Sequence, residues 1–170
     1  MKLTELFLAE LDRESERSKR ALEQVPEGKR EWKPHDKSMA FGYLAEMVAS
    51  MPSWVALAIN QDELDLNPPG GSQHKPAPMN TSAELLAGHE KHVADARSAL
   101  GKTTDEYLTT PWKLLVAGNV VFELPRHVVI RDLLNHLAHH RGQMTVYLRL
   151  MGATVPALYG PSADDKRFSL

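Results

Sequence analysis

Cysteine is absent from this 170-residue chain, which removes disulfides, thiolate metal ligands and a cysteine nucleophile from consideration. An excess of charge of one sign is also missing, because 20 basic residues face 22 acidic ones and leave a formal net charge of -2. That balance gives no broad electrostatic attraction to nucleic acid or to an anionic membrane. We therefore expect neither of them as a partner.

Long apolar runs are missing as well. No stretch approaches the roughly 18 consecutive apolar residues of a membrane span. Met1 leads into the amphipathic segment 2–6 rather than into the apolar core of a signal peptide. We therefore expect a cytoplasmic protein, and the length is that of one compact domain covering residues 1–170.

Four segments have the apolar periodicity of α-helices. They cover about residues 4–24, 41–60, 81–100 and 126–151. Pro52 lies inside the second segment and should kink it, since proline lacks an N–H and clashes with the preceding turn. The third segment opens with the capping-box sequence Thr81-Ser82-Ala83-Glu84, and we expect Gly101 to follow its last residue.

Two other stretches lack this periodicity. Residues 65–79 are rich in proline and glycine, which predicts a surface crossover between two helices. Residues 112–124 hold two short apolar runs around Gly118-Asn119, which is typical of a small hairpin. The sequence therefore predicts an all-α fold, a four-helix bundle with a small β-hairpin before the last helix.

His136 and His140 lie four residues apart in the last helical segment, within its apolar stripe. Residues at this spacing share one face of a helix, so we expect both imidazoles to point inward. Two imidazoles one turn apart can bind one metal ion, as in helical zinc sites. The alternative is a pair of buried histidines that are simply hydrogen-bonded, because an unpartnered buried pair is costly.

Two known helical metal motifs do not match the sequence. A zinc protease needs glutamate directly after the first histidine, where this chain has Leu137. Di-iron carboxylate bundles need paired Glu-x-x-His ligands, and Glu46, Glu84 and Glu90 are not followed by such a histidine.

The remaining histidines are weaker candidates. His89 and His92 stand beside Glu90 and Lys91, which favours a solvated helix face, although they are a reserve source of ligands. Three further histidines lie in or beside loops and receive no role: His35, His74 and His127.

The last helix carries a distinctive motif, His-His-Arg-Gly-Gln at 139–143, followed by Val-Tyr-Leu-Arg at 146–149. This motif resembles the last-helix signature of the DinB superfamily. The tail at 155–164 and the segment at 38–45, with Met-Pro-Ser-Trp at 51–54 after it, are similar to the corresponding parts of many members. The matching segments run in order from the second helix to the tail.

The resemblance implies a four-helix bundle with a divalent metal, such as zinc or nickel, on three histidines. Members with known activity are thiol-dependent transferases and isomerases that use low-molecular-weight thiols. Carried over by position, the two ligands of the last helix are His136 and His140, whereas the ligand of the second helix falls on Met47. Because a neutral thioether is a poor ligand for zinc or nickel, we expect low metal occupancy.

Two functions follow from these residues. The first is a metal-dependent transferase or isomerase that acts on small molecules with a thiol partner. The alternative is a non-catalytic family member without metal, which dimerises or binds an apolar small molecule in a soft pocket of Met47, Met51, Met144 and Tyr147. A homodimer is expected in either case, and the sequence assigns no catalytic residue.

Overall fold

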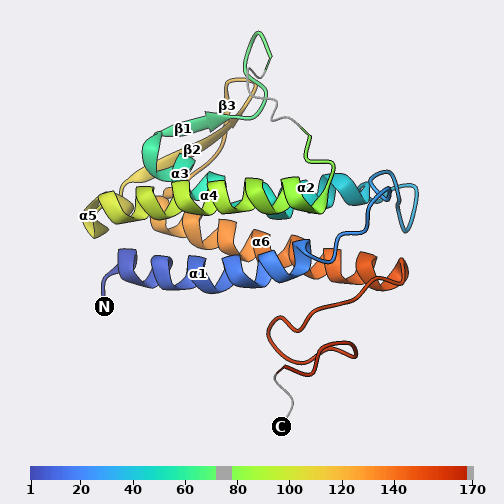
Figure 1. Cartoon of the computed structure of the whole chain (residues 1–170). Coiled ribbons are helices and arrows are strands. Elements are labelled where there is room, and N and C mark those ends of the chain that lie inside the picture. Colours follow the sequence, from blue (N-terminus) through green and yellow to red (C-terminus); the bar gives the residue numbers. More distant parts are fainter. Residues whose placement is uncertain (72–77, 168–170) are drawn as a thin grey trace.

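The computed structural model describes residues 1–71 and 78–167. This part of the chain is mostly helical, with six helices and a small three-stranded sheet (Figure 1). The helices are α1 (Leu3–Leu22), α2 (Phe41–Ser50), α3 (Pro52–Asn60), α4 (Ser82–Lys102), α5 (Asp105–Leu108) and α6 (Arg126–Leu150), and the strands are β1 (Glu63–Asp65), β2 (Pro111–Val116) and β3 (Asn119–Pro125).

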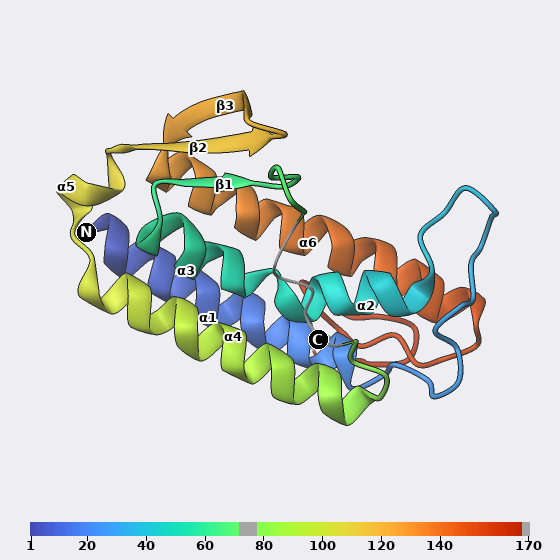
Figure 2. The ribbon, with the colours of Figure 1, turned by 90° about the horizontal axis from the view of Figure 1, so that it is seen from above.

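The long helices pack side by side around an apolar interior. α1 and the bent stretch α2–α3 each pack against both α4 and α6 (Figure 2). One apolar cluster surrounds Leu11, Trp112 and Ile130, and a second surrounds Leu44 and Met144. The C-terminal tail returns beneath α1 and α6, as Figure 1 shows.

The predicted helices are confirmed to within a few residues at most ends. Pro52 begins α3, and α2 and α3 are bent by 47° at this point, as expected for a residue that cannot continue the hydrogen-bond ladder. The capping box is also confirmed, since the Thr81 hydroxyl accepts from Glu84 N at 3.1 Å and Thr81 N donates to the Glu84 carboxylate at 3.2 Å. The predicted end at Gly101 is wrong, because α4 continues to Lys102 and Thr103 N still donates to Ala99 O.

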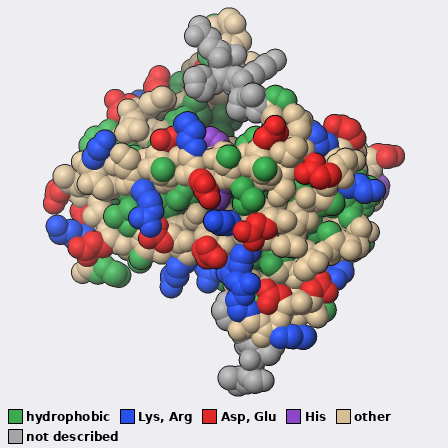
Figure 3. All heavy atoms as spheres, viewed as in Figure 1, with side chains coloured by type: hydrophobic (Ala, Val, Ile, Leu, Met, Phe, Trp, Pro, Cys, Tyr) green, Lys and Arg blue, Asp and Glu red, His purple; other side chains and the backbone are tan. Residues whose placement is uncertain are grey.

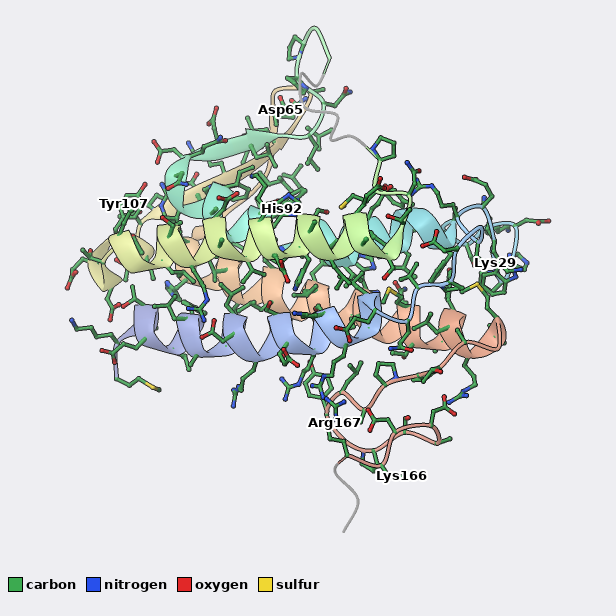
Figure 4. The ribbon with its side chains drawn as sticks, in the orientation of Figure 1. Lys29, Asp65, His92, Tyr107, Lys166 and Arg167 are labelled. Carbon is green, nitrogen blue, oxygen red and sulfur yellow. The ribbon has the colours of Figure 1, made fainter. Side chains whose placement is uncertain are left out.

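The predicted hairpin is confirmed as the antiparallel pair β2–β3, but its turn lies one residue earlier than expected. Ala117 and Gly118 both have positive φ, at 51° and 78°, as a two-residue hairpin loop of type I′ requires. A third strand, β1, was not predicted and pairs in parallel with β2. The Asp65 carboxylate at its end accepts from Ala117 N and Gly118 N at 3.0 and 2.7 Å, and Figure 4 shows Asp65 at this end of the sheet.

The predicted crossover at 65–79 is described only in part. Residues 72–77, which include His74, lie outside the described residues. Among the residues that are described, no single helix is long and apolar enough to span a membrane, whereas α2 and α3 taken together pass that test by length and composition.

Arg126, at the start of α6, joins this helix to the end of α3. Its buried guanidinium donates to Ala58 O and Gln61 O at 2.7 and 2.8 Å, and it pairs with the Asp62 carboxylate. Its Nε donates to the Thr110 hydroxyl at 3.1 Å. These bonds satisfy carbonyl groups that the end of α3 leaves open, and they fix where α6 begins.

A second buried arginine, Arg141, joins α6 to α1. It is fully buried and forms an ion pair with the Glu14 carboxylate. It also donates to Glu14 O at 3.1 Å and to the Ser18 hydroxyl at 3.0 Å. The Tyr159 hydroxyl donates to Glu14 at 2.8 Å, so the C-terminal tail is tied to the same pair.

Replacing Glu14 by glutamine should lower the free energy of unfolding by about 3 kcal/mol, because a buried guanidinium then loses its counter-charge. Urea denaturation followed by circular dichroism measures this change. The matched control is Asp95→Asn in the exposed Lys91–Asp95 pair, which should cost less than about 1 kcal/mol. Equal losses of unfolding free energy in the two variants would show that the buried Arg141–Glu14 pair stabilises the fold no more than an exposed pair does.

Candidate functional site

His136 and His140 lie one turn apart on α6 with their rings in contact. The ring centroids are 4.5 Å apart and the planes are inclined by 39°. His140 is 6% exposed, as predicted, whereas His136 is exposed and the prediction that it points inward is wrong. Four residues advance about 40° around a helix, so His136 lies at the rim of the stripe that His140 occupies.

The two ring nitrogens of His140 have different surroundings. Nδ1 lies 2.8 Å from Oε1 of Gln143, one turn further along α6. Nε2 is buried and has no hydrogen-bond partner within residues 1–71 and 78–167. A buried nitrogen without a partner is unusual, since most buried polar atoms are paired. Nε2 of His140 is therefore the atom of this site that is available to bind a ligand.

His139 is the third histidine of the group. Its ring lies 5.2 Å from His140 and 6.5 Å from His136, and the side chain is exposed. Although His136 is exposed, partial desolvation of its ring lowers its pKa, and the neighbouring charges of His140 and His139 lower it further. His136 is therefore held toward its neutral form, in which an imidazole nitrogen can coordinate a metal.

The third ligand position expected for a three-histidine site falls on α2. Met47 is partly buried there and packs against the apolar cluster around Leu44 and Met144. Within the part of the chain that the structure describes, no three histidine, aspartate or glutamate side chains are placed to share one ion. Imidazole nitrogens are suitable zinc ligands, so His136 and His140 remain the candidate ligands, but a complete set of three strong ligands is not present among these residues.

The four residues predicted to line a soft pocket share one apolar cluster between α2 and α6. Met51 and Met144 are buried within it, and Met47 and Tyr147 are partly buried against it. The Tyr147 ring stacks on Phe41 at a centroid distance of 6.3 Å.

Two open surface hollows lie elsewhere on the molecule. One, of about 290 Å³, lies between α1 and the tail, where Arg17 and Leu158 are among its lining residues. The other, of about 320 Å³, lies where α3 and α4 approach α5 and includes Tyr107. Neither hollow is lined by the paired histidines or by the four residues of the predicted pocket.

His89 does not lie on a solvated helix face. That expectation rested on the charged neighbours Glu90 and Lys91, and it is wrong. His89 is 1% exposed, and its Nε2 lies 3.1 Å from the Ser15 hydroxyl and 3.2 Å from Ser15 O. Burial lowers the pKa of His89, the nearby charges of His92 and Arg141 lower it too, and the hydrogen bond to the backbone of Ser15 partly opposes this change. His92, which Figure 4 shows on α4, is half-buried and its Nδ1 lies 3.1 Å from Ala49 O. Both histidines therefore connect α4 to neighbouring helices.

The lowered pKa of His89 predicts that the folded protein loses stability in mild acid. Below its ordinary value of about 6.5 the unfolded chain takes up a proton that the folded chain excludes. The free energy of unfolding therefore has its full value above this pH. As the pH falls below it, the free energy of unfolding decreases by up to about 1.4 kcal/mol per pH unit. Urea denaturation at pH 7.5 and 5.5 should show a smaller loss for His89→Gln than for the wild type.

The control for that measurement is His35→Gln, at an exposed position. It should keep the wild-type dependence on pH. A loss in His89→Gln as large as in the wild type would place the acid sensitivity at other groups.

Comparison with known proteins agrees with this architecture. The chain is 33% identical over 88 residues to the uncharacterized protein YrdA of Bacillus subtilis (strain 168), a match that spans 52% of this chain and 51% of the relative. The chain therefore spans about half the length of this curated relative.

Two solved structures share the fold. A DinB-like protein from Bacillus cereus ATCC 10987 superposes with a TM-score of 0.68 at 24% identity, covering 90% of this chain and 95% of that one. The DinB-like protein YjoA from Bacillus subtilis gives a TM-score of 0.68 at 16% identity, covering 88% and 94%. The sequence profile described as the DinB family matches residues 1–167, and this chain belongs to that family.

Proposed function

We propose that this protein binds a divalent metal, zinc or nickel, through His136 and His140, and uses it in thiol-dependent transfer or isomerisation of small molecules. The observation that carries the proposal is the buried Nε2 of His140, which has no hydrogen-bond partner among the described residues and belongs to a ring in contact with that of His136. Two imidazole nitrogens that bind one tetrahedral zinc at about 2.0–2.1 Å stand roughly 3.3 Å apart. Rings whose centroids are 4.5 Å apart can meet that requirement.

The surroundings of the pair suit such a site. The exposed ring of His136 leaves one side open to an exchangeable ligand, and a metal there would lower the pKa of a bound thiol. The proposed scaffold is the four-helix bundle of the family, with α1, α2–α3, α4 and α6 as its helices. The proposed setting is a cytoplasmic homodimer with a low-molecular-weight thiol as partner.

No nucleic-acid partner is proposed. Acidic side chains are interspersed among the basic ones over the face formed by α1 and α4 in Figure 3. A phosphate backbone is normally bound by a stripe or patch of basic residues alone.

One observation favours a second function. The family resemblance puts the third ligand at position 47, where this chain has methionine, and among the described residues no further carboxylate or imidazole completes a three-ligand group with the pair. If the two imidazoles bind metal too weakly for the protein to retain it, the second function is a non-catalytic role, either in binding an apolar small molecule or in dimerisation. Metal affinity separates the two functions.

Replacing His140 by alanine should abolish zinc binding, because it removes the buried nitrogen of the pair. Tag-free protein near pH 7.5 is titrated with zinc by calorimetry, and its metal content is measured by plasma mass spectrometry. The matched control is His139→Ala, which removes an exposed neighbouring imidazole and should leave the affinity unchanged. Equal zinc affinity in wild type and His140→Ala, or no binding in either, would contradict the proposal.

Replacing Met47 by histidine should raise the zinc affinity at least about tenfold, because a third imidazole replaces a thioether that binds zinc poorly. Met47→Leu is the control, since it removes the sulfur, keeps the side chain apolar and should leave the affinity at the wild-type value. The same calorimetric titration measures all three proteins. An affinity of Met47→His no higher than that of Met47→Leu would show that position 47 does not reach the ion.

A further inference from the structure

Gln143 is the one residue of the last-helix motif that contacts a proposed ligand by a side-chain hydrogen bond in the described part of the chain. Its Oε1 lies 2.8 Å from Nδ1 of His140, within ordinary hydrogen-bond distance. An amide oxygen can only accept a hydrogen bond. With Oε1 of Gln143 facing Nδ1, as the structure has it, a hydrogen bond between the two atoms puts the proton of a neutral His140 imidazole on Nδ1.

This placement of the proton decides the state of the other nitrogen. A neutral imidazole carries one N–H and one lone pair, so Nε2 of His140 carries the lone pair. That nitrogen is the buried atom without a hydrogen-bond partner among the described residues. A lone pair is what a metal ion needs from an imidazole.

Helix geometry explains why Gln143 can do this. Residues three apart on a helix are neighbours on its surface, and Gln143 is half-buried beside the buried ring. Because the hydrogen bond lies within α6, it does not depend on a contact with another helix. The contact is therefore made within α6 alone, in a structure that contains no metal.

We propose that Gln143 is a positioning residue that holds His140 as the Nδ1–H tautomer and presents its Nε2 to the metal. The part that concerns the metal rests on the function proposed above, whereas the tautomer is a property of the metal-free chain. In metal proteins, partners of this kind commonly hold a ligating histidine through its second nitrogen, and losing one costs about 10- to 100-fold in metal affinity.

The first test reads the tautomer directly. Long-range proton–nitrogen NMR correlations of the metal-free, nitrogen-15-labelled protein near pH 8 distinguish a protonated ring nitrogen from one with a lone pair. We expect Nδ1–H and a bare Nε2 for His140 in the wild type, and loss of this preference in Gln143→Leu. A protonated Nε2 in the wild type would overturn the proposal.

The second test measures affinity for zinc ions alone. Gln143→Leu should bind zinc about 10- to 100-fold more weakly than the wild type. Gln143→Glu keeps an acceptor oxygen and should restore both the tautomer and the affinity. The matched control is Thr145→Val, which removes the hydroxyl that donates to Gly142 O at 2.7 Å and should change neither readout.

The outcomes separate the two proposals. If His140 has the expected tautomer and Gln143→Leu loses it, but no protein of the series binds zinc, then the metal function fails while the positioning by Gln143 stands. If the wild type binds zinc and Gln143→Leu binds it equally well with an unchanged tautomer, then the metal function stands and the role of Gln143 is refuted.

Discussion

The ion pair between Arg141 and Glu14 is the contact on which the arrangement of α6 depends. A guanidinium keeps its charge under all physiological conditions, so a fully buried one requires a counter-charge. Burial raises the pKa of Glu14, but hydrogen bonds from Arg141 and Tyr159 and the charges of Arg141 and Arg17 together lower it by more, so the net pKa is below its ordinary value. The pair therefore stays ionised and holds α6, α1 and the C-terminal tail together.

This ion pair also sets the direction of the proposed site. Successive helical residues turn by about 100°, so fixing Arg141 against α1 fixes the rotation of α6 about its own axis. His140 precedes Arg141 directly, and its buried position follows from that rotation, as does the placement of Gln143 beside it. The motif at 139–143 thus combines a structural residue with residues of the proposed site, and its arginine and glutamine act by different means.

Much of the helical part could be predicted because periodicity, proline and capping signals are local. Pro52 marked the bend and Thr81 the start of α4 from their own chemistry alone. The strand β1 could not be predicted, because three residues carry no periodic signal and their partner β2 lies far along the chain. The burial of His89 was missed for a similar reason, since Ser15 of α1 is its partner, and the charged neighbours of His89 say nothing about α1.

For the proposed site, the sequence identified the residues but not their environments. The spacing of His136 and His140 placed them on one face, yet a 40° difference leaves one exposed and the other buried. This asymmetry is compatible with the proposed metal: His140 would supply a buried nitrogen, and His136 would stand where an outside ligand can approach. If the proposed metal is held by these two imidazoles alone, its affinity would depend strongly on how well Nε2 of His140 is positioned. The hydrogen bond that Gln143 accepts from His140 would then matter more than it does in a site with three imidazoles.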